Sequence, residues 1–203
     1  MDEQIGRIFA RLKAIGEYDN TIIVFTSDQG IAIGSHGLMG KQNLYEHSMR
    51  SGMIFAGPGI PRGQSVNAFA YLFDIYPTLC DVAGAPKPES LDGKSLMPVI
   101  QGKTAQVRDT VLLGYRDFQR AVRQGQWKLI RYPQIDRTQL FDLEADPYEI
   151  NDLAARPEQR ARVEQLMKAL RAQQRIFGDK LPLTAEHPRP GDINLEFFAT
   201  KKG

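Results

Sequence analysis

The sequence predicts an α/β fold with helices, followed by a small carboxyl-terminal antiparallel sheet and a long helix. Residues 21–26 form an apolar, β-branched run, which is typical of a strand buried on both faces of a parallel sheet. Residues 5–15 place apolar side chains three and four positions apart, as an amphipathic helix does. Residues 111–143 contain strand-like runs at hairpin spacing. The change from buried runs to hairpin-spaced strands predicts two layers of organisation.

The length and composition of the chain limit the classes of protein to which it can belong. The 203 residues are enough for one sizeable core, or for a core and a small subdomain. A net charge of +2 gives no global basic field, so we expect no nucleic-acid partner. The single cysteine, Cys80, excludes an internal disulfide. No apolar run reaches membrane-spanning length, so we expect no membrane span.

The amino-terminal part alternates helices and strands in the order of an α/β unit. Gly16 ends the first helix, and Asp74 is a candidate N-cap for a helix that Gly84 ends. Residues 57–61 force a turn. In chain order we expect a helix over residues 2–15, a strand over 21–26, a helical turn over 44–50, strands over 53–56 and 68–73, and a helix over 74–84.

The carboxyl-terminal part follows a linker rich in proline, glycine and serine at residues 86–93. We therefore predict two domains, residues 1–85 and residues 86–203. The triplet 124–126 makes a hairpin turn. The expected elements are a short helix over residues 96–100, strands over 111–115, 120–123, 127–132 and 139–143, a long helix over 158–177 and an irregular tail from Gly178.

A loop after the first strand gathers an unusual set of polar groups. It carries Asp28, Gln29, His36 and Lys41, and in open α/β sheets ligands bind at this edge. The oxygens of Asp28 and Gln29 suit Ca²⁺ or Mg²⁺ better than zinc, but Ca²⁺ takes six or more oxygen ligands, so others must come from elsewhere. A lysine near a cation repels it unless an anionic group lies between them. The set therefore indicates a metal-assisted site for an anionic substrate.

Each of these residues also has an ordinary interpretation. Asp28 could cap the next turn, and Lys41 could be a solvated surface charge. His36 could be a loop histidine without a role, or a proton donor to a leaving oxygen. His47 falls in a helical turn and is interpreted as structural, and His187 as incidental.

A series of segments, in a fixed order along the chain, resembles a known protein family. These segments are residues 19–30 (DNTIIVFTSDQG), 34–41 (GSHGLMGK), 44–46 (LYE), 57–61 (GPGIP), 74–79 (DIYPTL), 91–96 (LDGKSL), 123–130 (RQGQWKLI) and 140–153 (LFDLEADPYEINDL). Together they resemble the carboxyl-terminal half of a type I sulfatase, a family of the alkaline-phosphatase-like superfamily. The resemblance spans most of the chain and implies a partial alkaline-phosphatase-like sheet with helices.

The resemblance also implies roles for individual residues. Asp28 matches a carboxylate ligand of a calcium ion, and Gln29 stands where the family more often has Asn or His. Lys41 matches the lysine that contacts the substrate sulfate, and His36 a histidine that faces the active-site pocket. The stretch around Asp146 resembles a family landmark that we interpret as structural.

The chain departs from the family in what it lacks. No C/S-x-P-x-R motif, the source of the formylglycine nucleophile, occurs in the sequence, and Cys80 does not fit that pattern. The family's early pair of acidic metal ligands is also absent. Residues 1–4 read as a helix start inside a domain, without a signal pattern, although an exported or periplasmic place suits the full-length family. The chain thus resembles a sulfatase without its amino-terminal half.

These features leave three functions open. The first is the carboxyl-terminal portion of a sulfatase acting on a sulfated small molecule or glycan, inactive alone for want of a nucleophile. The second is a non-catalytic remnant or interaction module, and the third is a phosphoesterase of the same superfamily. The strand at residues 21–26 would lack sheet partners, so we also expect a tendency to self-associate through an exposed edge.

Overall fold

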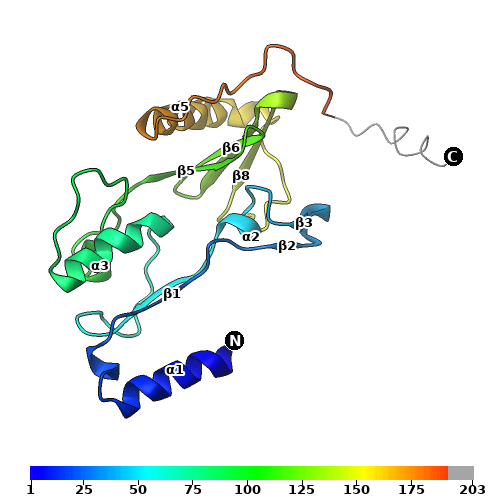
Figure 1. Cartoon of the computed structure of the whole chain (residues 1–203). Coiled ribbons are helices and arrows are strands. Elements are labelled where there is room, and N and C mark those ends of the chain that lie inside the picture. Colours follow the sequence, from blue (N-terminus) through cyan, green and yellow to red (C-terminus); the bar gives the residue numbers. More distant parts are fainter. Residues whose placement is uncertain (192–203) are drawn as a thin grey trace. The chain divides into compact units, whose positions relative to one another are not determined.

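The computed structural model describes residues 1–191, which divide into two compact units (Figure 1). Unit 1 comprises residues 1–30 and 50–109, and unit 2 comprises residues 31–49 and those from 110 onward. The units are therefore interleaved along the chain. The predicted domain boundary near residue 86 stays a prediction.

Unit 1 contains most of the elements predicted for the amino-terminal part, in the expected order. The helix at residues 2–15 is confirmed, although none of its side chains is buried. The helix after Asp74 is confirmed too, and Gly84 ends it in the left-handed conformation. The elements are α1 (Asp2–Ala14), a 3-10 turn (Tyr18–Asn20), β1 (Ile23–Thr26), β4 (Met53–Ala56), a 3-10 turn (Leu72–Asp74), α3 (Ile75–Ala83) and α4 (Met97–Ile100).

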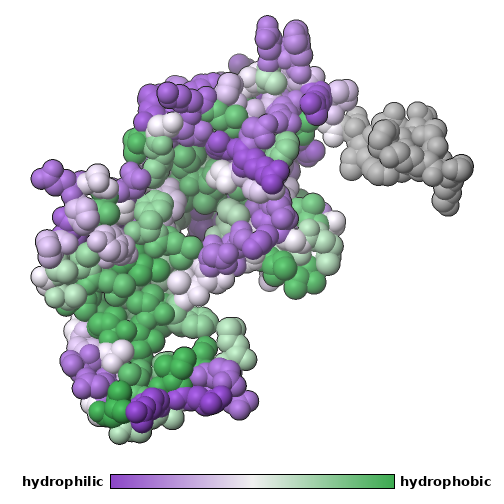
Figure 2. All heavy atoms as spheres, in the orientation of Figure 1, coloured by the Kyte–Doolittle hydropathy of each residue, from purple (hydrophilic) through white to green (hydrophobic). Residues whose placement is uncertain are grey.

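The first strand is less enclosed than its sequence indicates. Within the described residues β1 has one partner, β4, and the two run antiparallel, with Thr26 opposite Met53. Phe25 is 47% exposed and Ile54 58% exposed, because no second layer of the described unit covers them. The expectation of a parallel strand buried on both faces is thus wrong for this part of the chain. Green, apolar surface is visible over the elements of unit 1 in Figure 2.

The strand expected at residues 68–73 is also wrong. That segment makes no ladder with another described strand and ends in the 3-10 turn Leu72–Asp74. The turn is stabilised because the Asp74 side chain accepts a hydrogen bond from a backbone amide that, in a sheet, would donate to a neighbouring strand. Its carboxylate accepts from the backbone amide of Tyr71 at 2.6 Å.

Asp74 is the buried centre of unit 1. It occupies the N-cap position of α3 but makes no side-chain cap bond to that helix, which corrects the expected role. Instead its fully buried carboxylate accepts from the amide of Lys94 at 2.8 Å and pairs with Arg108 through both oxygens. Thr78, one turn into α3, accepts from the amide of Leu96 at 2.8 Å. These bonds tie the segment before α4 to the start of α3.

Unit 2 is built on a four-stranded antiparallel sheet in the order β5-β6-β7-β8. The four strands and the long helix of the sequence analysis are confirmed. The elements are β2 (Ala32–Ile33), a 3-10 turn (Ser35–Gly37), β3 (Met39–Gly40), α2 (Glu46–Met49), β5 (Thr110–Tyr115), β6 (Gln119–Gln124), β7 (Trp127–Tyr132), a 3-10 turn (Pro133–Ile135), β8 (Arg137–Asp142), a 3-10 turn (Pro157–Gln159) and α5 (Arg160–Ile176). Between Gly178 and residue 191 the tail is irregular, as expected, and its last residues lie outside the described part.

Both faces of this sheet are covered, so its strands are apolar on both sides. Strand residues alternate between the faces. On one face Val122, Leu129 and Leu140 pack against Leu166 and Leu170 of α5. The other face, formed by Ala121, Ile130 and Phe141, packs against Leu44 from the segment before α2. A segment far away in sequence thus completes the core of unit 2.

None of the described helices is long and apolar enough to cross a membrane.

The buried pair of Asp74 and Arg108 yields the first prediction. In Asp74→Asn the Arg108 guanidinium, whose side chain is 7% exposed, keeps its burial and loses its counter-charge. We expect unit 1 to lose about 3–5 kcal/mol of stability. Hydrogen exchange of the Lys94 and Leu96 amides measures this loss. The exposed Asp19→Asn serves as control, with an expected change within about 0.5 kcal/mol; equal protection in both variants would contradict the role of Asp74.

Candidate functional site

The predicted site residues fall in two groups. Asp28 and Gln29 follow β1 in unit 1, whereas His36 and Lys41 belong to unit 2. That the two groups lie together, with Asp28 close to Lys41, stays a prediction.

Asp28 and Gln29 form a tight turn at the end of β1. The Asp28 carboxylate accepts from the Gln29 amide at 2.9 Å, and Ser27 donates its hydroxyl to the Gln29 carbonyl at 2.9 Å. The Asp28 side chain is exposed. Its carboxylate and the Gln29 amide are the oxygen donors that a hard cation prefers. No cluster of three or more acidic, histidine or cysteine side chains suited to a metal occurs among residues 1–191, so these two would supply only part of a coordination shell.

His36 lies at the tip of a short hairpin. Strands β2 and β3 pair Ile33 with Met39, and the amide of Gly34 donates to the carbonyl of Leu38 at 2.9 Å. His36 itself has a φ of 55°, in the left-handed region that histidine enters more readily than most residues. Lys41 follows β3 directly and is exposed. The hairpin thus presents an imidazole at its turn and an ammonium at its end.

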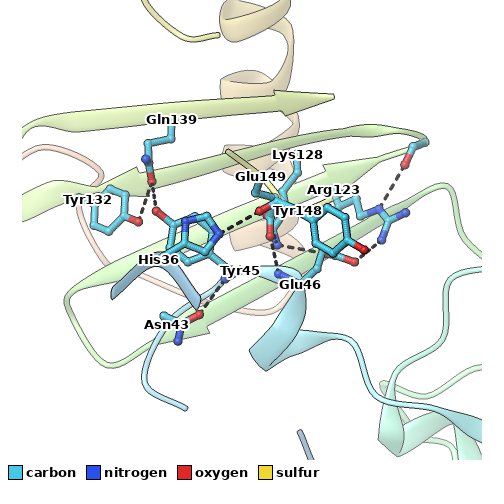
Figure 3. A network of polar contacts seen from close by, with 11 residues as sticks. His36, Asn43, Tyr45, Glu46, Arg123, Lys128, Tyr132, Gln139, Tyr148 and Glu149 are labelled. Atoms are coloured by element: carbon cyan, nitrogen blue, oxygen red, sulfur yellow. Dashed lines mark hydrogen bonds and ion pairs between the residues drawn. The ribbon is translucent and has the colours of Figure 1, made fainter. Parts of the chain in front are cut away.

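The His36 ring is held on two sides (Figure 3). It stacks on Tyr45, with ring centroids 4.0 Å apart and planes 4° from parallel. Its Nε2 lies 2.9 Å from the backbone carbonyl oxygen of Tyr148. A carbonyl only accepts, so Nε2 carries the proton and Nδ1 is the nitrogen left with a lone pair.

The Tyr45 ring is fixed in turn by the sheet. Its hydroxyl donates to Oε1 of Gln139 at 2.9 Å, and the same oxygen accepts from Tyr132 at 2.8 Å. Burial raises the pKa of the Tyr132 phenol, which therefore stays a neutral donor. The Tyr45 amide donates to Asn43 at 3.1 Å. Tyr45 is therefore a rigid platform for the imidazole.

A cluster of charges lies beside this platform. The ammonium of Lys128, on β7, is fully buried and lies 3.0 Å from Glu46 and 2.8 Å from Glu149. Glu46 also accepts from Arg123 at 2.7 Å. Burial raises the pKa of the Glu149 carboxyl, and the Lys128 ammonium opposes this more than any other group. Two acids thus balance two bases, as a buried ionic group requires.

Glu149 also connects the cluster to the histidine. Its second oxygen accepts from the backbone amide of Glu46 at 2.6 Å, at the first residue of α2. The preceding carbonyl, that of Tyr148, is the one that contacts His36. Figure 3 shows Glu46, Lys128 and Glu149 converging next to the His36 and Tyr45 rings.

This cluster was not predicted from the sequence. The segment around Asp146 was interpreted as structural, and Lys128 was not singled out. A signal was present, because the run Trp127–Tyr132 reads as a strand buried on both faces yet contains a lysine. A lysine in such a strand requires a buried acid as partner. Nothing in the sequence alone says which of its acids that is.

Comparison with known proteins identifies the family. A family model described as N-sulphoglucosamine sulphohydrolase, C-terminal, matches residues 34–176. The N-acetylglucosamine-6-O-sulfatase of Bacteroides thetaiotaomicron is 36% identical over 195 residues, which cover 90% of this chain and 35% of that protein. The chain thus spans about a third of this curated relative's length.

Solved structures agree. A protein in complex with its substrate, D-glucosamine-2-N,6-O-disulfate, matches with a TM-score of 0.83 and 33% identity, over 91% of this chain and 40% of that one. The phosphonate monoester hydrolase of Agrobacterium radiobacter matches with a TM-score of 0.72 and 30% identity, over 85% of this chain and 39% of that one. The alkaline-phosphatase-like fold predicted from the sequence is confirmed.

The second prediction concerns His47, which lies near His36 and Lys128. Burial first, then the charges of His36 and Lys128, lowers the pKa of His47 below its usual 6.5. Its Nε2 is buried and has no hydrogen-bond partner among the described residues. The unfolded chain therefore takes up this proton before the folded chain does, and unit 2 loses stability as the pH falls through 6.5.

We expect wild type to lose stability relative to His47→Gln between about pH 7.5 and about pH 5.5, one unit on either side of the usual pKa. Urea unfolding followed by the fluorescence of Trp127, the single tryptophan, measures this in unit 2. His187→Gln, at an exposed position, is the matched control and should behave as wild type. A constant difference between wild type and His47→Gln across this range would contradict the prediction.

Proposed function

Because the chain belongs to the sulfatase family, through its match to the C-terminal region of N-sulphoglucosamine sulphohydrolase, we propose that it is the carboxyl-terminal portion of a sulfuric ester hydrolase. The observation that carries the proposal is the hairpin of unit 2, which holds His36 in a fixed orientation and has Lys41 at its end. An oriented imidazole and an exposed ammonium on the same hairpin suit an anionic ester with a basic leaving oxygen.

Each residue has a distinct role in this proposal. Lys41 binds a sulfate oxygen, and its charge stabilises the negative charge that grows as the ester bond breaks. In its imidazolium form His36 donates the proton on Nδ1 to the leaving oxygen, while Nε2–H stays bound to the Tyr148 carbonyl. Asp28 and Gln29 would hold a calcium or magnesium ion, which when bound polarises the sulfate oxygens. The remaining metal ligands and the nucleophile come from outside these 203 residues, which contain no C/S-x-P-x-R motif.

The substrate in this proposal is a sulfated small molecule or a sulfated glycan. The support is the substrate of the matching structure, a glucosamine disulfate, and the name of the Bacteroides relative. A phosphoesterase is the second candidate, favoured by the likeness to a phosphonate monoester hydrolase. A non-catalytic interaction module is the third, since the chain alone has no nucleophile motif.

The third prediction tests the chain as it stands. With calcium and a chromogenic aryl sulfate, the purified 203-residue protein should give no turnover above background, because charge stabilisation without a nucleophile leaves little acceleration. Turnover that disappears in Lys41→Ala would mean that the chain supplies its own nucleophile.

The fourth prediction tests the roles of Lys41 and His36. A hybrid protein joins the amino-terminal portion of the Bacteroides relative to this chain in place of its own carboxyl-terminal portion. We expect hydrolysis of a sulfate ester, with kcat/KM about 10²–10³-fold lower in Lys41→Ala. His36→Gln should lower kcat about 10²–10⁴-fold, most strongly for esters with poor leaving groups.

The control variant is Lys180→Ala, which removes an exposed lysine of unit 2 and should leave kcat/KM unchanged. An aryl phosphonate monoester run in parallel distinguishes the second candidate, which predicts preferential cleavage of the phosphonate. A folded hybrid whose sulfate ester hydrolysis is equal with and without Lys41 would refute the proposed role.

A further inference from the structure

The contact between His36 and Tyr148 joins two segments that are far apart in sequence. The carbonyl oxygen of Tyr148 lies 2.9 Å from His36 Nε2 and belongs to the peptide that links Tyr148 to Glu149. The orientation of this peptide therefore decides whether His36 finds its acceptor. The dihedral angles of Glu149 are part of what sets that orientation.

Glu149 has an unusual backbone for its residue type. Its φ is 58°, in the left-handed region, where a residue with a long side chain is uncommon. Such a conformation persists only where surrounding contacts determine it. The amide of Glu149 donates to the carbonyl of Asp146 at 3.1 Å, which closes the turn. The other contacts that hold this backbone conformation are made by the Glu149 side chain.

The side chain of Glu149 is anchored at both oxygens. One lies 2.8 Å from the buried ammonium of Lys128, and the other accepts from the amide of Glu46 at 2.6 Å. The residue is 2% exposed. Lys128 belongs to β7 of the sheet and the Glu46 amide to α2, both in unit 2, so the carboxylate fixes the 148–149 peptide to the same body that carries Tyr45 and the His36 ring.

We propose that Glu149 is a positioning residue for His36: its anchored carboxylate holds the Tyr148 carbonyl as the acceptor for His36 Nε2–H. The imidazole is then kept as one tautomer, with Nδ1 as the nitrogen that exchanges a proton with substrate. This inference rests on the proposed role of His36 as a proton donor. It adds that the segment of residues 146–151 sets which nitrogen performs that role.

A purely structural role for Glu149 is the competing interpretation. Neutralising a buried acid beside Lys128 lowers the stability of unit 2 under either interpretation. The tautomer of His36 separates them, because a structural role alone leaves the imidazole as it is in wild type. Long-range proton–nitrogen correlation spectra of the uniformly ¹⁵N-labelled chain report that tautomer directly, without any turnover.

In the wild-type chain at alkaline pH we expect His36 as a single Nε2–H tautomer, and exposed His187 as an average of both. The His36 signals are assigned by their absence in His36→Gln. In Glu149→Ala we expect His36 to average as His187 does. Exchange of its Nε2 proton with water should become about tenfold faster, the factor that loss of one hydrogen bond implies.

Two further variants sharpen the comparison. Glu149→Gly accepts a positive φ without strain, so averaging there reports the lost carboxylate and not a clash of the new side chain. Glu144→Ala removes an exposed acid from the same connection and should leave His36 unchanged. If Glu149→Ala does not fold, the charge-balanced pair Lys128→Met with Glu149→Ala replaces it, because apolar replacement of a buried ion pair is often tolerated.

The proposal is overturned if His36 keeps its single Nε2–H tautomer in folded Glu149→Ala or in the double variant, or if it averages in wild type. These outcomes leave the sulfatase assignment untouched, since that is tested by the hybrid protein. Conversely, a hybrid without turnover refutes the proposed function while the tautomer measurement on the chain still stands.

Discussion

The buried ammonium of Lys128 constrains much of unit 2. It lies within a four-stranded sheet whose two faces are covered, where an unpaired charge would cost several kcal/mol. Its two carboxylate partners come from α2 and from the connection after β8, so a folded sheet requires both segments to dock. Docking α2 brings Leu44 and Tyr45 onto the sheet, and Tyr45 carries the His36 ring. The orientation of a candidate catalytic group thus follows from the need to neutralise a lysine.

The local features of this arrangement could be predicted from the sequence. The hairpin-spaced runs between residues 111 and 143 gave the four strands, because alternation and a Gly125 turn are encoded within a few residues. The amphipathic pattern gave α5 in the same way. The candidate residues His36 and Lys41 were found by their chemistry and their spacing after a strand. The charge cluster was not, since Glu46 and Lys128 are 82 positions apart and Glu46 and Glu149 are 103 apart.

For the first strand, by contrast, the apolar pattern predicted the secondary structure correctly but predicted the burial of the strand wrongly. Residues 21–26 are as apolar as a doubly buried strand, yet Phe25 stays half exposed beside the single antiparallel partner that residues 1–191 provide. Hydrophobic character is a property of the run itself, whereas burial depends on the layers that other segments supply. The same holds for Asp28 and Gln29, whose oxygens suit a cation but which belong to no cluster of three or more acidic, histidine or cysteine side chains among the described residues. Asp74 differs again, because its position at the N-cap was predicted correctly but its carboxylate binds Arg108 and makes no cap bond to α3. A charge-assisted bond to a buried guanidinium is stronger than a bond to a backbone amide of the helix.

The hairpin of residues 32–40 depends for its order on contacts with other segments of unit 2. A two-residue strand pair has little stability by itself, and His36 adds a left-handed residue at the tip. Among the described contacts, the stack on Tyr45 and the bond to the Tyr148 carbonyl hold the ring, which also lies beside the His47 ring. Both supports lead back to the sheet, one through Gln139 and the other through Glu149 and Lys128. A hairpin this short cannot bury an apolar core of its own, so its order has to come from a neighbouring body. In this chain that body is the carboxyl-terminal sheet, which accounts for a segment of residues 31–49 that folds with residues more than sixty positions further along.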